Sequence, residues 1–321
     1  MMPVRLLGFV LLLGAIVAFF GALSPHFAAT ANVSAILRHM SAIELAALGL
    51  TFVVVVRRSD LSFPGIASLG AMTAGWFVAQ EQGLPLALLA GISIGIACGA
   101  ISGAAVGFMR LPDIVSTIAI GAISASLSFL YSQGATISDN FVSVGLVDFN
   151  NRSIGLVGVP VLLMLAINLA AWMFLHCTRF GRGFYATGEN PRSALLSGIR
   201  TRAYVLGAFA ASGGMSCLAG ILRSAEAGQA HVHIGSSFLL PAYASVYLGA
   251  ALFGRASVAA TFASCLLISA TLNGCNLLSV PYYYGEGIIG LLVLLTVIAF
   301  DPRTGGLLDT AIRHSGNKTE A

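Results

Sequence analysis

Apolar segments, separated by glycine, proline or charged residues, follow one another along almost the whole chain. A helix needs about 20 apolar residues to cross a bilayer, and most of these segments approach that length. The segments 41–56, 65–80 and 238–253 fall short of it, so we expect broken or tilted helices there, with their backbone buried in protein. In all, the pattern predicts about ten transmembrane helices, at residues 6–23, 41–56, 65–80, 84–108, 113–131, 157–176, 203–222, 238–253, 257–273 and 287–300.

The composition leads to the same fold class. Hydrophobic residues make up 57% of the 321 residues and charged residues only 9%. A soluble protein has about 25% charged residues, so this chain has too few charges to cover a surface that faces water. We therefore predict an all-α integral membrane protein.

The basic residues predict how the helices are oriented. Ten spans with both termini in the cytoplasm leave only Arg38, Arg152 and Arg223 of the 16 lysines and arginines on the opposite side. The other thirteen are cytoplasmic, which is the bias that the positive-inside rule describes. Omitting the first span would scramble this bias, so we interpret residues 6–23 as a retained helix rather than a signal peptide. The cytoplasmic set is Arg5, Arg57, Arg58, Arg110, Arg179, Arg182, Arg192, Arg200, Arg202, Arg255, Arg303, Arg313 and Lys318.

The fourth apolar segment carries a glycine at every fourth position. Glycine costs an isolated helix about 1 kcal/mol relative to alanine, but in lipid a stripe of small residues lets a neighbouring backbone approach closely. We expect this stripe to pack within one subunit, and an interface between two subunits is the alternative. The stripe is Gly91, Gly95, Gly99, Gly103 and Gly107.

The segment 179–202 carries the signals of a short helix between two apolar segments. Asn190 is a suitable N-cap, Pro191 fits the first helical position, and Gly198 can adopt the left-handed conformation that ends a helix. The helix would have about seven residues, too few to be stable alone in water. Its apolar residues Ala194, Leu195 and Leu196 therefore need a packing partner, which indicates a docking site at the cytoplasmic face.

Catalytic motifs are absent from the sequence. There is no GxxxxGK[ST] phosphate loop, no HExxH and no GxSxG, so we predict a protein that is not an enzyme and has no catalytic residues. His231 and His233 are too few to indicate a metal site, and none of the five cysteines forms a CxxC pair. We expect no metal and no cofactor. The scattered basic residues also exclude a nucleic-acid interface.

Polar residues within the apolar segments are the remaining candidates for a passage. Glu44 should face protein or a water-filled path, unless it lies near the outer interface, because a charge at the bilayer centre is costly. Asp60 or Ser62 can cap the third helix, so the turn that follows Arg57 and Arg58 is either a simple capped turn or part of a gate. Asn273 closes the ninth segment at the external side.

The residues 178–199, TRFGRGFYATGENPRSALLSGI, closely resemble the coupling-loop motif of ABC-importer permease subunits of the ribose/xylose/autoinducer-2 group. Ser193 stands where that family has an alanine. AALGLTFVVVVRRSDLS (46–62) is similar to a second family segment, with Arg57 and Arg58 in place of two glycines, and LPDIVST (111–117) is similar to a third. The coupling motif is matched by Thr178, Gly181, Arg182, Tyr185, Ala186, Gly188, Asn190, Ala194, Gly198 and Ile199.

The resemblance implies a permease subunit for a ribose-like pentose or a related sugar or polyol, in the bacterial inner membrane. It implies one transmembrane domain over 1–321, with a coupling loop at 179–202 between spans six and seven and a cytoplasmic tail at 303–321. The expected partners are an ABC ATPase subunit, a periplasmic sugar-binding protein and a second permease subunit, identical or different. The residues expected at the ATPase-coupling helix are Gly188, Asn190, Pro191, Arg192, Ala194 and Gly198, and those expected at a gate or solute path are Glu44, Asp60, Ser62, Thr117 and Asn273.

Three other functions stay open from the sequence. The same superfamily includes permeases for branched-chain amino acids or nucleosides. A secondary carrier could use Glu44 as its proton site, although one carboxylate is weak support for such coupling. A scaffolding membrane protein would need the loop 179–202 only to set its topology.

Overall fold

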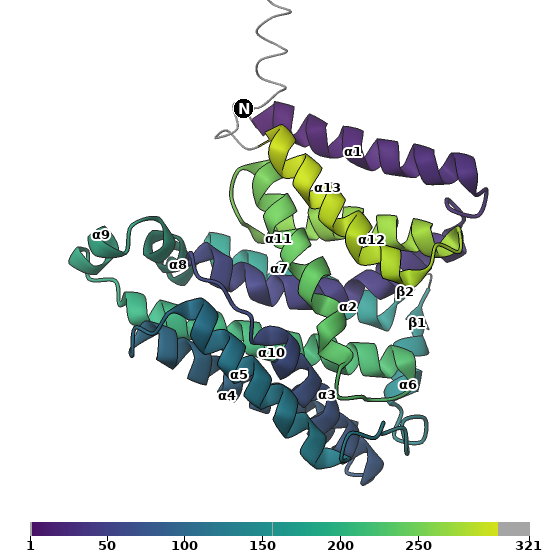
Figure 1. Cartoon of the computed structure of the whole chain (residues 1–321), viewed down its shortest axis with the longest axis horizontal. Helices are drawn as coiled ribbons and strands as arrows, with labels where there is room; N and C mark the ends of the chain where they lie inside the picture. Colours follow the sequence, from purple (N-terminus) through teal and green to yellow (C-terminus); the bar gives the residue numbers. More distant parts are fainter. Residues whose placement is uncertain (1, 156, 301–321) are drawn as a thin grey trace, which may run out of the picture.

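The computed structural model describes residues 2–155 and 157–300, and in these it is almost entirely helical (Figure 1). The only strands in the described residues are β1 (Ser153–Ile154) and β2 (Val157–Gly158), which pair antiparallel. The helices are α1 (Met2–Leu23), α2 (Thr30–Val55), α3 (Phe63–Ala79), α4 (Leu84–Gly107), α5 (Asp113–Ser128), η1 (Phe129–Tyr131), α6 (Leu146–Asn151), α7 (Val159–Cys177), α8 (Arg179–Glu189), α9 (Pro191–Leu196), α10 (Thr201–Ala227), η2 (Ile234–Phe238), α11 (Leu239–Phe253), α12 (Val258–Leu277), η3 (Tyr282–Tyr284) and α13 (Gly285–Phe300).

Helices of membrane-spanning length confirm the all-α membrane fold. Within the described residues, 7 helices are long and apolar enough to cross a bilayer. They are α2, α4, α5 with η1, α7, α10, η2 with α11, and α12. Three shorter apolar helices accompany them, at 7–23 in α1, in α3, and at 285–296 in α13.

Helix α2 corrects the second predicted segment. It begins at Thr30 and has 26 residues, so the predicted start at residue 41 is wrong, and the helix is neither short nor broken. Polar residues such as Arg38 and His39 interrupt the apolar run but continue the helix. The predicted shortness of α3 is confirmed, since it has 17 residues. Helix α11 has 15 residues, but it continues from η2 and the two together make a span of 20 residues.

Helix α10 lies at the centre of one half of the bundle and packs against α2, α3 and α4 (Figure 1). The glycine stripe of α4 lets α10 approach closely, with the Cys217 side chain and backbone atoms of α10 directly against it. A Cβ added at Gly95 would lie 2.5 Å from the carbonyl oxygen of Gly213, and one added at Gly103 would lie 2.7 Å from the Cα of Leu206. The stripe therefore packs within the chain, as expected, and it brings two helix backbones into direct contact.

The two ends of the bundle carry different short elements. Helices α8 and α9 extend from one end, at the left of Figure 1, and α6, β1 and β2 lie at the opposite end. The loop between η1 and α6 is fastened there by the buried Phe141 and by a β-bridge between Ile137 and Ala230. The predicted tail at 303–321 lies outside the described residues.

Candidate functional site

The segment after α7 forms two helices where the sequence predicted one. Helix α8 was not predicted, because its three glycines lower helix propensity. For the same reason Thr178 was not recognised as an N-cap. The hydroxyl of Thr178 accepts a hydrogen bond from the backbone N–H of Gly181 at 3.2 Å. Asn190 then separates α8 from α9.

Helix α9 has the ends that its sequence predicts. The side-chain oxygen of Asn190 accepts a hydrogen bond from the N–H of Ser193 at 3.1 Å, and Pro191 occupies the first helical position. At the other end Gly198 has a φ of 81°. The N–H groups of Gly198 and Ile199 each donate back into the last turn at 3.0 Å, a Schellman arrangement. Its two caps thus stabilise a helix of only 6 residues.

Contacts of α9 divide its apolar residues into two groups. Ala194 is buried against the rest of the chain, whereas Leu195 is 62% exposed and Leu196 is 85% exposed. Two large apolar side chains at a protruding tip are a surface that a partner protein could bury. Arg192 is exposed beside them.

Helix α8 is packed backbone to backbone against its neighbours. A Cβ added at Gly188 would overlap the carbonyl oxygen of Val55 at the end of α2, and one added at Gly181 would overlap that of Leu175 in α7. The hydroxyl of Tyr185 donates to the carbonyl of Ala256 at 3.4 Å, and the Arg255 guanidinium lies 5.4 Å from the Tyr185 ring centre. Burial raises the pKa of Tyr185, while the charge of Arg255 lowers it. These contacts connect α8 rigidly to three parts of the bundle.

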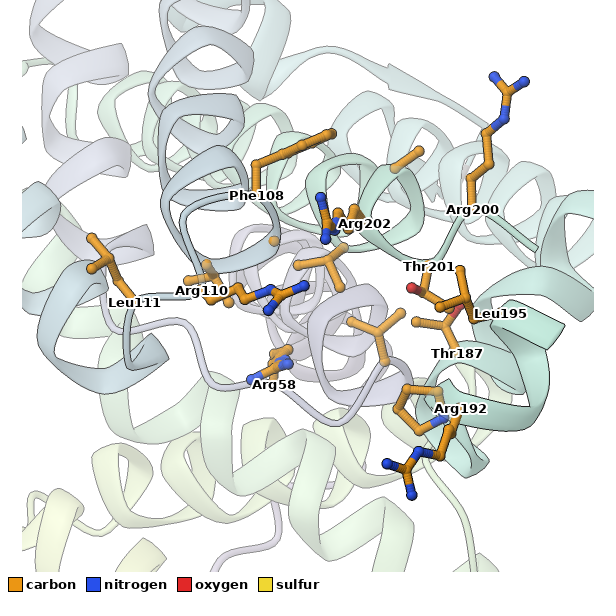
Figure 2. A pocket seen from close by; sticks show the side chains of 16 residues that line it. Arg58, Phe108, Arg110, Leu111, Thr187, Arg192, Leu195, Arg200, Thr201 and Arg202 are labelled. Carbon is orange, nitrogen blue, oxygen red and sulfur yellow. The ribbon is translucent and has the colours of Figure 1, made fainter. Parts of the chain in front are cut away.

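A pocket of about 820 Å³ opens beside α9. It is lined by the turns after α2 and α4, by α9 and by the start of α10 (Figure 2). No carboxylate is among its lining residues, all of which belong to the described part of the chain. Its charged lining residues are Arg58, Arg110, Arg192, Arg200 and Arg202.

Asp60 lies in the turn between α2 and α3 and is fully buried. One carboxylate oxygen accepts hydrogen bonds from the N–H and the hydroxyl of Ser62, and the other accepts from the Ser212 hydroxyl of α10 at 2.7 Å. The Tyr243 hydroxyl of α11 donates to the Asp60 carbonyl at 2.8 Å. The expectation that Asp60 or Ser62 caps α3 with its side chain is wrong for Ser62. Ser62 occupies the N-cap position, but its hydroxyl is engaged by Asp60.

Helix α5 fastens the same turn from a third direction. The Thr117 hydroxyl accepts a hydrogen bond from the N–H of Leu61 at 3.1 Å, and the Asp113 carboxylate accepts one from the N–H of Ser59 at 2.9 Å. Asp60, Ser62 and Thr117 are thus brought together. Asp113, Ser212 and Tyr243 were not predicted as partners of this turn, because each comes from a distant helix.

Replacing Asp60 by alanine should lower the free energy of unfolding by about 2–4 kcal/mol, because it leaves the hydroxyls of Ser62 and Ser212 buried without their acceptor. Asparagine retains one acceptor oxygen, so Asp60→Asn should cost less than half as much. Thermal unfolding in detergent would measure both changes. Ser59→Ala is a matched control one residue away, since only the backbone N–H of Ser59 is bonded. Equal losses for Asp60→Ala and Asp60→Asn would contradict the network.

The other two proposed path residues lie elsewhere. Glu44 is fully buried in the middle of α2, near Cys265 and Asn168, so its side chain faces protein. Neither of its oxygens has a hydrogen-bond partner among the described residues. Asn273 accepts a hydrogen bond from the side chain of Asn32 at 2.9 Å, which ties α12 to the start of α2. Neither residue touches the Asp60 turn.

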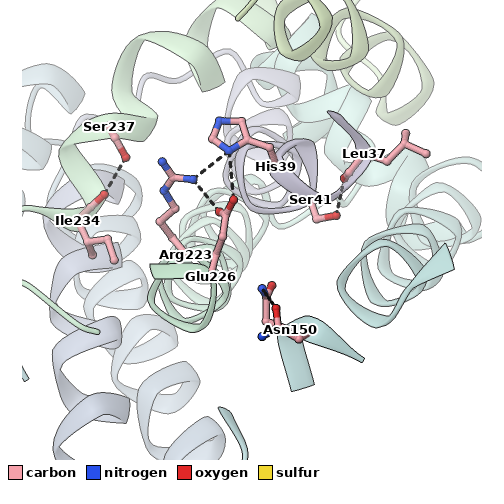
Figure 3. Close-up of polar contacts among 9 residues, drawn as sticks. Leu37, His39, Ser41, Asn150, Arg223, Glu226, Ile234 and Ser237 are labelled. Atoms are coloured by element: carbon pink, nitrogen blue, oxygen red, sulfur yellow. Dashed lines mark hydrogen bonds and ion pairs between the residues drawn. The ribbon is translucent and has the colours of Figure 1, made fainter. Parts of the chain in front are cut away.

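A charged cluster at the end opposite α9 was not predicted. Arg223 donates to Glu226 at 2.6 Å and lies 2.9 Å from the Nδ1 of His39, which links α10 to α2 (Figure 3). Arg223 lines two neighbouring pockets of about 290 and 490 Å³. His231 and His233 line the larger one. Burial lowers the pKa of His231, and His233 and Arg223 lower it further.

Known proteins resemble the chain over nearly its whole length. Residues 32–297 match the model of the family described as branched-chain amino acid transport system / permease component. The ribose import permease protein of Escherichia coli (strain K12) is 30% identical over 288 residues, which are 88% of this chain and 89% of that protein. The D-allose transport system permease protein of the same strain is 32% identical over 290 residues, 89% and 88% of the two chains.

A third relative is named for the import of autoinducer 2. The autoinducer 2 import system permease protein of Salmonella typhi is 28% identical over 298 residues, which are 92% of this chain and 85% of that protein. No solved structure matches the chain.

Proposed function

Since the chain belongs to the family of branched-chain amino acid transport system permease components, we propose that it forms the membrane passage of an ABC importer for a monosaccharide. The transported solute would be a ribose-like pentose or a related sugar or polyol. Relatives named for ribose and for D-allose support a sugar over a branched-chain amino acid or a nucleoside. Membership in a permease family, together with the apolar helices, makes the chain a multi-pass protein of the inner membrane and a transport subunit rather than an enzyme.

The proposed topology has ten spans with both termini in the cytoplasm. The 7 long helices and the three shorter apolar helices α1, α3 and α13 supply that number. Support for the orientation comes from the pocket beside α9, where five arginines gather at one end of the bundle. That end would be cytoplasmic, and the cluster around Arg223 would face the periplasm.

Helix α9 is the proposed docking element for a separate ATPase subunit, which would hydrolyse the ATP. The observation that carries this proposal is a capped helix whose Leu195 and Leu196 protrude unburied while α8 behind it is fixed against α2. A displacement of α9 would be transmitted through the contact of Gly188 to the end of α2, and from there to the Asp60 turn. Asn190, Pro191 and Gly198 would hold the tip, Ala194 would anchor it, and Arg192 would contact the ATPase.

The turn at Asp60 is the proposed gate, with Ser62 and Thr117 as its support. Glu44 and Asn273, which lie apart from it, would belong to the solute path away from the gate. A periplasmic sugar-binding protein would deliver the solute to the end that carries Arg223, and a second permease subunit, identical or different, would complete the passage. The family assignment favours the importer over the proton-coupled carrier, for which the buried Glu44 would be the proton site, and over the scaffolding protein.

Replacing both Leu195 and Leu196 by serine should lower ATP-driven sugar uptake at least about 10-fold, since burial of two leucines at an interface is worth several kcal/mol. The measurement is uptake into proteoliposomes that contain the chain, its ATPase and its binding protein. Val142→Ser is the matched control, because Val142 is 65% exposed but lies in the loop before α6. Uptake that persists without ATP and stops when the proton gradient is dissipated would overturn the proposed function.

A further inference from the structure

Three arginines from three separate turns meet in the pocket beside α9. Arg58 follows α2, Arg110 follows α4, and Arg202 lies in the first turn of α10. Their side chains point toward one central space in Figure 2, whereas Arg200 points away from it. The pocket volume of about 820 Å³ is in the range of sites for small ligands.

The positive charge of this pocket is not compensated by a carboxylate in the part of the chain that the structure describes. In the described residues no carboxylate lies within 4.0 Å of these three guanidinium groups. The carboxylate of Asp113 is close in sequence to Arg110 but accepts a hydrogen bond from the N–H of Ser59. Like charges that share a pocket repel one another, so an anion that entered would be attracted by all three.

The backbone at two of these turns is unfavourable for arginine. Arg57 has a φ of 54° and Arg110 a φ of 58°, in the left-handed region that favours glycine. Glycine would fit the position of Arg110 without this cost, so backbone geometry does not explain the arginine there. Arg57 adjoins Arg58 but does not line the pocket.

We infer that this pocket binds the phosphate group of an anionic ligand between Arg58, Arg110 and Arg202. Guanidinium groups bind phosphate oxygens through paired, charge-assisted hydrogen bonds, and three of them suit a dianion. A neutral sugar lacks the negative charge that three guanidinium groups favour, so we assign the site to a ligand other than the transported solute. The phosphate belongs either to a soluble phosphorylated molecule or to the headgroup of an acidic phospholipid.

A bound phosphate would join the turns after α2 and α4 to the start of α10. The turn after α2 leads directly into the Asp60 turn, so the ligand would hold in place the segment that the proposed gate needs to move. Occupancy should therefore stabilise the protein and slow uptake. The effect on uptake rests on the proposed function, whereas the binding of phosphate does not.

The binding test uses the purified chain in neutral detergent and the triple variant Arg58→Gln, Arg110→Gln, Arg202→Gln. Inorganic phosphate and pyrophosphate are titrated at constant ionic strength while thermal unfolding is followed. In a second arm, native mass spectrometry counts retained phosphatidylglycerol against phosphatidylcholine. Arg179→Gln is the matched control, since Arg179 is a basic residue of α8 outside the pocket lining.

We expect the wild-type chain and Arg179→Gln to bind alike and the triple variant to bind at least about 10-fold more weakly, which is the effect of losing about 1.4 kcal/mol. Stabilisation by the soluble phosphates identifies a soluble ligand, and selective retention of phosphatidylglycerol identifies a lipid. The inference is overturned if the triple variant and Arg179→Gln lose binding equally, or if no phosphate species binds. Sugar uptake by the reconstituted transporter is measured separately, so failure of the proposed function would be recognised independently.

Discussion

Replacing Gly99 by leucine should abolish the folded protein. A Cβ at Gly99 would overlap the carbonyl oxygen of Phe209 and lie 3.1 Å from the Cα of Ala210, both backbone atoms of α10. A rotamer change cannot relieve such a contact, so α4 and α10 would have to separate along their length. Overpacking in a core costs about 1–3 kcal/mol even where side chains can adjust, and folded proteins are stable by only about 5–15 kcal/mol.

The measurement is the yield of monodisperse protein after detergent extraction and size-exclusion chromatography. Gly14→Leu is the matched control, because Gly14 also lies in an apolar helix and a Cβ there meets nothing within 4 Å. The control should be extracted like the wild-type chain, while Gly99→Leu should give only aggregate. Normal yield of Gly99→Leu would show that α4 and α10 do not pack as described.

Replacing Gly188 by alanine should uncouple ATP hydrolysis from transport. The added methyl group would force the end of α8 away from the carbonyl of Val55, although the caps of α9 and its exposed leucines are left intact. The ATPase should therefore still bind, but its motion would reach α2 through a displaced contact. Uptake should fall at least about 10-fold, since about 1.4 kcal/mol added to the barrier suffices for that.

Sugar uptake and ATP hydrolysis by the reconstituted transporter provide the two readouts for Gly188→Ala. Gly207→Ala is the control, because Gly207 lies at the same end of the bundle and its Cβ would meet only Phe184, at an ordinary 3.7 Å. We expect hydrolysis to continue in both variants and uptake to be lost only in Gly188→Ala. Equal uptake by the two variants would remove α8 from the coupling path.

The sequence predicted those helices whose ends or apolar faces are determined by residues close together in the chain. Asn190, Pro191 and Gly198 sufficed to predict α9, because a capping side chain and a left-handed glycine act within a few residues. The apolar runs predicted most of the long helices for the same reason. The predicted start of α2 was wrong, because charged residues can continue a helix whose other faces are buried.

The candidate sites show where a single sequence does not suffice. Asp60 and Ser62 could be singled out as polar residues in a turn, but their partners Ser212 and Tyr243 come from α10 and α11. Hydroxyl groups are common on buried helices, and nothing local distinguishes these two. Helix α8 was missed because Gly181, Gly183 and Gly188 lower helix propensity, and the close neighbours that require them, two backbones and the Tyr204 ring, come from other helices.

The direct contact between α4 and α10 also limits how the protein can move. Side chains that interdigitate can change rotamer and let two helices slide. Where a glycine contacts a carbonyl oxygen, there is no side chain that could adjust. The register of these helices is consequently fixed, and they must travel as a single rigid body. Alternating access would then occur along boundaries that lack glycine contacts, and spin labels placed on α4 and α10 should keep a constant separation through the whole ATP cycle.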